Sequence, residues 1–244
     1  MFKNKVVLIT GATSGIGEET AKAFAKEGAS VVLVGRNKEK GLHIEQEILS
    51  SNGKAIFIPC DVSNDQEVQK MVTKAIDTFG KIDILFNNAG TMLPSMEIER
   101  MPIADWQKTF DTNLLSMFLV TRYAKPYIIA QKGTIINNAS IAGLQHYAAG
   151  RSYAYSASKA AVIQFSHQMA KNYAPEGVRV NCICPGIIQT PILHGRDPKI
   201  YESRIPLGYV GTPQDVAKVV VFLASENASY ITGAVIPVDG GVTL

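Results

Sequence analysis

Seven short runs rich in valine and isoleucine, separated by segments with helical periodicity, constrain the fold of this chain more than any other feature. The runs are VVLIT, SVVLVG, KAIFIPC, IDILFN, GTIINNAS, VRVNCIC and AVIPV. Strands that are apolar along their whole length are buried on both faces, as in parallel sheets covered by helices. Helices are expected at about 15–27, 37–51, 64–79, 103–130, 153–174 and 213–224. The alternation predicts a single α/β domain over residues 1–244, with a doubly wound parallel sheet of about seven strands and helices on both faces.

The composition limits the partners and the compartment. Charged residues make up 18% of the 244, the net charge is only +3, and the two signs are mixed along the chain. We therefore expect no nucleic-acid partner. No apolar run reaches the roughly 18 residues of a membrane span, and the first residues lead directly into a strand. These features indicate a cytoplasmic protein with no membrane partner.

The cysteines and histidines do not form a metal or triad pattern. Cys60, Cys182 and Cys184 lack the paired spacing of a metal site, and we expect them to be reduced core residues, with a reactive thiol as the alternative. His167 and His194 have no neighbours in the sequence that complete a metal site or a Ser/His/Asp triad. The sequence therefore predicts no metal centre.

A glycine-rich turn, TGATSGIG, joins the first expected strand to the first expected helix. Glycines have no side chains to obstruct a tight turn or the close approach of a ligand to the backbone. The N-terminus of a helix attracts anions through its free N–H groups and its dipole. A dinucleotide pyrophosphate fits such a site, although the spacing is GxxxGxG and not the commoner GxGxxG. The contact residues expected in this turn are Gly11, Thr13, Ser14, Gly15, Ile16 and Gly17.

The end of the second expected strand distinguishes between the two nicotinamide dinucleotides. An acidic side chain there would accept hydrogen bonds from the adenine ribose of NAD(H), but this chain has Gly35 followed by Arg36. A guanidinium pairs well with a 2′-phosphate through charge-assisted hydrogen bonds. We therefore expect NADP(H) as the cofactor. If Arg36 instead stacks on the adenine or faces solvent, NAD(H) is also acceptable.

Further short motifs follow along the chain in a characteristic order. They are CDVS, NNAG at 87–90, Asn113 in FDTNLLS, Ser140, YSASK at 155–159, PGIIQT at 185–190 and a closing ITGAVIPVDGG. With the glycine turn, they make essentially the whole chain resemble a short-chain dehydrogenase/reductase of about 250 residues, a family with a Rossmann fold. The resemblance implies that Asp61 and Val62 lie against the adenine. It implies that the remaining cofactor contacts are Asn88, Ala89, Gly90, Tyr155, Lys159, Pro185, Gly186, Ile188 and Thr190.

The stretch RSYAYSASKAA contains two tyrosines and one lysine. Carbonyl reduction needs a proton donor beside the developing alkoxide. A phenol with a pKa of about 10 needs about 4 kcal/mol of preferential stabilisation of its phenolate to reach a pKa of about 7. A nearby ammonium and the oxidised nicotinamide can supply it. Residues four apart share a helix face, whereas residues six apart do not. Tyr155 is four residues from Lys159 and Tyr153 is six, so helix geometry selects Tyr155 as the general acid/base.

Ser140 is expected to polarise the substrate carbonyl, but its spacing favours the other tyrosine. In the family the serine usually precedes the tyrosine by about 13 positions, which here falls on Tyr153, whereas Tyr155 is 15 positions away. We expect a two-residue extension in the loop IAGLQHYAAGRS, because loops absorb insertions and a helix face does not. By resemblance, Asn113 completes the catalytic set by holding a water that links Lys159 to solvent.

Two loops are expected to shape the substrate pocket. His146 and Tyr147 belong to the extended loop and are candidates to line the pocket. Residues 190–211 lack clear periodicity, which favours a substrate loop over a solvent-exposed connection. This second loop has charges of both signs and so indicates neither an acidic nor a basic substrate; its charged residues are Arg196, Asp197, Lys199, Glu202 and Arg204.

The sequence therefore predicts an oxidoreductase that transfers a hydride between NADP(H) and a small secondary alcohol or ketone. A nicotinamide-binding regulator without turnover is the alternative, but it has no need of a proton donor. A methyltransferase also fits a parallel sheet, but it leaves Arg36 and the Tyr/Lys pair without a function. The resemblance and the small residues Ala157, Ala160 and Ala161 indicate a homodimer or homotetramer, although these alanines could equally pack against the chain's own sheet.

Overall fold

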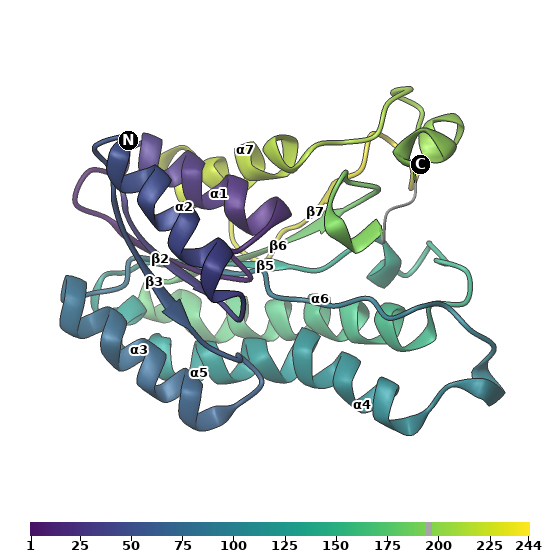
Figure 1. Ribbon diagram of the computed structural model, residues 1–244, viewed down its shortest axis with the longest axis horizontal. Helices are drawn as coiled ribbons and strands as arrows, with labels where there is room; N and C mark the ends of the chain where they lie inside the picture. The colour runs from purple at the N-terminus through teal and green to yellow at the C-terminus, as the bar shows by residue number, and fades with distance from the viewer. Residues whose placement is uncertain (194–196) are drawn as a thin grey trace.

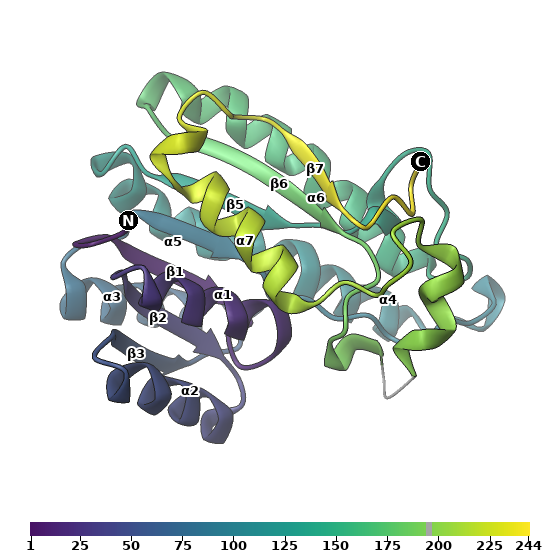
Figure 2. The same ribbon diagram turned by 90° about the horizontal axis from the view of Figure 1, so that it is seen from above.

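Seven parallel strands form one sheet in the computed structural model, which describes residues 1–193 and 197–244. The strands are β1 (Val6–Thr10), β2 (Ser30–Gly35), β3 (Lys54–Pro59), β4 (Ile84–Asn87), β5 (Thr134–Asn138), β6 (Arg179–Pro185) and β7 (Val235–Val238). Their order across the sheet is β3-β2-β1-β4-β5-β6-β7, and each pairing is parallel. Figure 2 shows the strands side by side in this order. The predicted α/β fold class is confirmed.

Helices cover both faces of the sheet, as Figure 1 shows. One face carries α1 (Gly15–Lys26), α2 (Lys38–Ser50) and α7 (Pro213–Ala224). The opposite face carries α3 (Asp65–Phe79), α4 (Ile103–Phe110), α5 (Ser116–Ala130) and α6 (Tyr153–Tyr173). Alternate residues of one strand therefore pack into different cores: Leu8 of β1 packs with α3, α5 and α6, and Ile9 packs with α1, α2 and α7.

The single helix expected over residues 103–130 is interrupted at its centre, and that prediction is wrong there. A π-helical segment, Asp111–Leu115, separates α4 from α5. Such a segment adds a residue to one turn and changes which side chains face inward. Asn113 is fully buried within it. The apolar periodicity on both sides does not reveal one wide turn between two α-helices.

The order of the strands places a crevice at the carboxyl ends of the central pair. After β3 at the edge, the chain crosses back to β4, which lies beside β1. The connections that follow β1 and β4 diverge to opposite faces of the sheet, and ligands of open parallel sheets bind at such a point.

Residues 190–211 contain short 3₁₀ segments at Pro191–Leu193 and Pro198–Arg204. His194 and Arg196 lie outside the described residues. In the part of the chain that the structure describes, no helix has both the length and the apolar character needed to cross a membrane. The same residues contain no cluster of three or more His, Cys, Asp or Glu side chains that could hold a metal ion.

Candidate active site

A cleft of about 750 Å³ lies along the carboxyl ends of the strands. Its walls include the residues that follow β1, β3, β4 and β5 and the ends of β2 and β6. It brings together nearly all of the cofactor contacts expected from the sequence: Gly11, Thr13, Ser14, Gly15, Ile16, Arg36, Asp61, Val62, Asn88, Ala89, Gly90, Tyr155, Lys159, Pro185, Gly186, Ile188 and Thr190. Ser140 also lines the cleft, whereas Gly17 and Asn113 do not.

The glycine turn has the backbone geometry of an anion cradle. Gly11 and Gly15 have φ angles of +64° and +56°, in the left-handed region that favours glycine. A Cβ at Gly11 would lie 2.9 Å from the Cα of Ala89, so only glycine lets the two loops approach this closely. The side chain of Ser14, before α1, makes no capping hydrogen bond to the helix. The first N–H groups of α1 therefore remain available for a phosphate.

Gly17 has a different role from the one expected. It is buried one turn into α1 and does not line the cleft. A Cβ at this position would lie 2.2 Å from the carbonyl oxygen of Gly11 and 2.6 Å from Nδ2 of Asn88. Gly17 therefore allows the helix to pack against the glycine turn, and its contact with the cofactor stays a prediction.

A chain of hydrogen bonds connects the glycine turn to the lysine of α6. Asn88 donates from Nδ2 to the carbonyl oxygens of Thr10, at 3.0 Å, and Gly11, at 3.2 Å. Asn138 donates from Nδ2 to Oδ1 of Asn88 at 2.8 Å. The backbone oxygen of Asn138 accepts from Nζ of Lys159 at 2.7 Å. The glycine turn and Lys159 therefore belong to one polar framework.

Asn138 is the member of this framework that the sequence analysis missed. It lies in IINNAS, two residues before Ser140, where its place at a strand end was the only available signal. Its Oδ1 is buried and has no hydrogen-bond partner in the described residues. It is therefore an unsatisfied buried acceptor within the polar framework behind the cleft.

The structure places Tyr155, and not Tyr153, beside Ser140. Tyr155 is half-buried in the cleft wall, and its phenol shares a hydrogen bond with the Ser140 side chain. The side chain of Tyr153 is 37% exposed and does not line the cleft. Ser140 is followed by a 3₁₀ turn, Ile141–Gly143, and residues 144–152 connect that turn to α6. Tyr155, the tyrosine that helix geometry selects, thus lines the same cleft as Ser140, and Tyr153 does not.

Burial shifts the pKa values of both the phenol and the ammonium away from their charged forms. Loss of solvent raises the pKa of Tyr155, and the hydrogen bond to Ser140 opposes that rise. Loss of solvent lowers the pKa of Lys159 to about 8. The ammonium lies 5.8 Å from the centre of the Tyr155 ring. The protein alone therefore does not produce the lowered phenol pKa expected from the sequence.

Asn113 uses its side chain to join two segments of the site. Its Oδ1 accepts from the backbone N–H of Thr91 at 2.7 Å. Its Nδ2 donates to the carbonyl oxygen of Thr91 at 3.0 Å and to Oγ of Ser158 at 2.9 Å. Asn113 and Lys159 both approach Gly90, since a Cβ there would lie 3.4 Å from Oδ1 of Asn113 and 3.3 Å from Nζ of Lys159. Both N–H donors of the amide are used, and Oδ1 accepts one hydrogen bond.

Arg36 is an exposed cation at the edge of the cleft. It forms no ion pair with a carboxylate among the described residues. Hydrogen bonds from Ser63 outweigh desolvation and lower the pKa of Asp61, and the charge of Arg36 contributes a smaller part. A Cβ at Gly35 would lie 2.7 Å from Cγ2 of Thr13. The position at which an acid would bind an unphosphorylated ribose is therefore closed to a side chain unless Thr13 moves.

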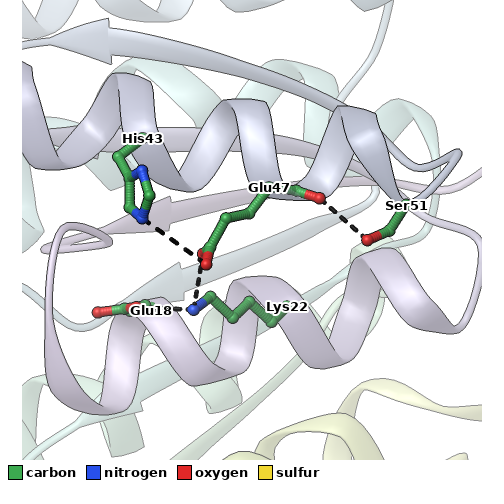
Figure 3. A network of polar contacts seen from close by, with 5 residues as sticks. All are labelled: Glu18, Lys22, His43, Glu47 and Ser51. Carbon is green, nitrogen blue, oxygen red and sulfur yellow. Dashed lines mark hydrogen bonds and ion pairs between the residues drawn. The ribbon is translucent and has the colours of Figure 1, made fainter.

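Figure 3 shows an ion-pair network that joins α1 to α2, the helices that follow the glycine turn and Arg36. Nζ of Lys22 lies 2.8 Å from Oε1 of Glu18 and 2.9 Å from Oε2 of Glu47. Nε2 of His43 lies 3.7 Å from Oε1 of Glu47. Desolvation lowers the pKa of Lys22. The hydrogen bonds to the carboxylates of Glu18 and Glu47 outweigh that effect, and the pKa of Lys22 is raised overall. The network fixes two cofactor-facing elements relative to each other.

The remaining candidates differ in their placement. Tyr147 lines the cleft, whereas His146 is exposed and does not. Thr190 lines the cleft and its hydroxyl donates to the carbonyl oxygen of Ile188 at 3.3 Å. The three cysteines are buried and free, and none of them pairs in a disulfide; they are Cys60, Cys182 and Cys184.

Known proteins with this sequence pattern and this fold are numerous. A family model described as enoyl-(acyl carrier protein) reductase matches residues 11–243. The chain is 39% identical over 247 residues to a 3-oxoacyl-(acyl-carrier-protein) reductase FabG of Thermotoga maritima, covering 100% of this chain and 99% of that relative. It is 38% identical over 245 residues to a meso-2,3-butanediol dehydrogenase of Serratia marcescens, covering 99% of this chain and 96% of that relative.

Two solved structures superimpose closely on the chain. One is a short-chain type dehydrogenase/reductase from Mycobacterium marinum, with a TM-score of 0.94 and 35% identity. The other is a short-chain dehydrogenase/reductase of unknown function from Caenorhabditis elegans with cofactor, with a TM-score of 0.93 and 33% identity. Each alignment covers 99% of this chain and 96% of the other.

Proposed function

The chain belongs to the short-chain dehydrogenase/reductase family, and we propose on that basis that it transfers a hydride between NADP(H) and a secondary alcohol or ketone with Tyr155 as the general acid/base. Members of the family are NAD(P)-dependent oxidoreductases of CH–OH or keto groups. The observation that carries the more specific proposal is the convergence of Tyr155, Ser140 and Lys159 on one cleft. The Ser140 side chain interacts there with the phenol of Tyr155, and Nζ of Lys159 lies 5.8 Å from the centre of the tyrosine ring.

Each of these side chains has a distinct part in the reaction. When bound, the nicotinamide supplies or accepts the hydride. In the reductive direction Tyr155 donates its proton to the developing alkoxide, and Ser140 holds the same oxygen by a hydrogen bond. Lys159 binds the ribose, and with a pKa of about 8 it stays largely protonated at neutral pH. Its charge favours the phenolate that the oxidative direction requires.

The cradle around these residues fits a dinucleotide. Gly11 and Gly15 line the cleft at the N-terminus of α1, where their positive φ angles and lack of side chains suit a pyrophosphate. The preference for NADP(H) is supported by Arg36, which lines the cleft and forms no ion pair with any carboxylate that the structure describes. It is also supported by Gly35, where the packed methyl of Thr13 leaves no room for the acid that an NAD(H) site would use.

The test is a comparison of two tyrosine variants in a carbonyl screen. Oxidation of NADPH and NADH is followed against ketones of graded size, including sugars, steroids, β-keto esters and quinones. Tyr155→Phe should lower kcat by about 100-fold or more, because general acid catalysis contributes at least that much. Tyr153→Phe is the matched control and should be nearly neutral. Near-normal turnover by Tyr155→Phe contradicts the proposal, and a preference for NADH contradicts the role of Arg36.

The same screen separates the enzyme from a cofactor-binding regulator. A regulator would show an NADPH-dependent rise in Tm and no turnover with any ketone. We also propose that the protein is cytoplasmic, that residues 190–211 form the substrate loop, and that the chain forms a homodimer or homotetramer. Analytical ultracentrifugation with and without NADPH tests the last point, and a monomer at micromolar concentration would contradict it.

A further inference from the structure

The sequence does not show which charged side chains of residues 197–204 reach the cleft, but the structure does. Asp197, Lys199, Glu202 and Arg204 lie in or beside the 3₁₀ segment Pro198–Arg204. Of these four, only Arg204 lines the cleft. Side chains three residues apart eclipse in a 3₁₀-helix, and Tyr201, three residues earlier, lines the cleft with Arg204. The segment therefore turns one cationic face toward the cavity and its acids away from it.

The residues that follow Arg204 hold its backbone in place by packing against Gly240. The next residue, Ile205, is 4% exposed. It packs closely on Gly240, because a Cβ on that glycine would lie 2.6 Å from Cγ2 of Ile205. Leu207 donates from its backbone N–H to the carbonyl oxygen of Gly240 at 3.1 Å. The 3₁₀ segment thus ends on a buried anchor, which holds the backbone of Arg204 at the rim of the cleft.

No carboxylate neutralises Arg204 within the part of the chain that the structure describes. It belongs to none of the ion pairs there. Oδ1 of Asp197 accepts a hydrogen bond from the backbone N–H of Lys199 at 3.0 Å and so caps the segment. Among the described residues, Asp61 is the one carboxylate that lines the cleft. It accepts hydrogen bonds from the backbone and hydroxyl of Ser63 and lies in the electrostatic field of Arg36.

The lining of the same cleft also includes apolar groups. Side chains from the two loops that frame Ser140 and Tyr155 contribute methyl, methylene and ring carbons. They are Ile141, Ala142, Tyr147, Ala148, Ile192 and Leu193. A ligand with a short apolar body and one anionic end matches such a wall, because an unpaired guanidinium forms strong charge-assisted bonds with carboxylate or phosphate.

We propose that Arg204 binds the anionic group, a carboxylate or phosphate, of a ketone substrate whose apolar body lies against these loops. The inference rests on the proposed carbonyl reductase function and adds the substrate class. Arg204 acts on recognition alone and takes no part in proton transfer. Its effect should therefore appear as a difference in kcat/KM between the charged and the neutral form of the same ketone.

The experiment compares three series of ketones that differ only at the far end: straight-chain oxo-carboxylates, their methyl esters and the corresponding oxo-alkyl phosphates. Wild type should favour one anionic series over the ester by about tenfold in kcat/KM, equivalent to about 1.4 kcal/mol. The preference should appear mainly in KM and weaken as salt is raised. Comparing the two anionic series tells carboxylate from phosphate recognition.

Variants then assign the preference to Arg204. In Arg204→Gln the ratio of anion to ester should fall to about one, and Arg204→Lys should keep part of it. Lys199→Gln removes the same charge from the same segment but does not line the cleft, so its ratio should match wild type. An unchanged ratio in Arg204→Gln, or equal use of anion and ester by wild type, overturns the inference while the reductase proposal stands.

A binding measurement keeps the two proposals separate. The rise in Tm caused by the oxo-carboxylates or phosphates is measured in the presence of NADPH. If no ketone is turned over, the proposed function fails. In that case a Tm rise in wild type that is lost in Arg204→Gln and kept in Lys199→Gln still supports an anion site. An equal rise in wild type and Arg204→Gln, or none in either, overturns it.

Discussion

Replacing Lys159 with methionine should stabilise the protein without cofactor at neutral pH, although it should abolish activity. The side chain of Lys159 is buried, at 3% exposure, and loss of solvent lowers its pKa from 10.5 to about 8. Each pKa unit corresponds to about 1.4 kcal/mol, so holding this proton costs the folded state about 3 kcal/mol at pH 7. Methionine fills a similar volume without a charge.

The gain is offset by the hydrogen bond that the variant loses. Nζ of Lys159 donates to the backbone oxygen of Asn138 at 2.7 Å, and an unsatisfied buried acceptor costs about 1 to 3 kcal/mol. The net gain at pH 7 is therefore between zero and about 2 kcal/mol, or up to about 8 °C in Tm for a chain of this length.

The pH dependence gives the sharper result, because it isolates the charge from the hydrogen bond. Below pH 8 both the folded and the unfolded chain carry the proton, so the full cost is present. Between pH 8 and 10.5 the folded chain loses the proton first, and wild-type stability rises relative to the variant. The difference in free energy of unfolding, variant minus wild type, should fall by about 3 kcal/mol between pH 7 and pH 10.

The assay is urea unfolding without cofactor at both pH values and at one protein concentration. Lys171→Met, on an exposed position of the same helix, is the control, and its difference from wild type should stay constant. A Lys159→Met difference that does not change with pH, or a loss of several kcal/mol at pH 7, refutes the reasoning that burial penalises this ammonium.

Three further perturbations test other parts of the structure. Arg36→Ala should lower the ratio of kcat/KM for NADPH to that for NADH by about tenfold or more, the value of a charge-assisted bond to phosphate; an unchanged ratio would show that Arg36 does not contact the 2′-phosphate. Gly17→Ala should weaken cofactor binding, since the new Cβ would lie 2.2 Å from the oxygen of Gly11; isothermal titration with NADPH measures this, and unchanged affinity contradicts it. Thr212→Ala removes one half of the capping box of α7 and should cost about 1 kcal/mol of unfolding free energy in urea melts; no loss would show that Asp215 alone satisfies the helix end.

The strands, the glycine turn and the choice of tyrosine could be predicted because each depends on local chemistry. Buried parallel strands must be apolar along their length, and a turn at the N-terminus of α1 needs residues such as Gly11 that tolerate a positive φ. The pairing of Tyr155 with Lys159 depends only on the period of a helix. The structure accordingly puts Tyr155, and not Tyr153, against Ser140 despite a serine spacing that pointed the other way.

The features that escaped prediction depend on packing between distant segments. In the π-helical turn, the side chain of Asn113 bridges Thr91 and Ser158, which are far from it in sequence. Gly17 was assigned to the ligand because the sequence does not show that α1 packs against the glycine turn at that point. The selection of Arg204 from a loop of mixed charges likewise required the 3₁₀ phase of its segment.

A buried charge lies at each end of the sheet, and the two charges differ in how well their neighbours compensate them. At the amino ends of the strands, Asp83 is 2% exposed but accepts from the backbone N–H of Val6 at 2.8 Å and pairs with Lys5 at 3.3 Å and Lys81 at 3.1 Å. At the carboxyl ends, Lys159 is 3% exposed, and its ammonium donates to the neutral backbone carbonyl of Asn138. Removing one partner of a compensated buried charge leaves the other partners unpaired. Poorly compensated buried charges with perturbed pKa values cluster at functional sites. Asp83→Asn and Lys159→Met should therefore change the stability of the cofactor-free protein in opposite directions at pH 7.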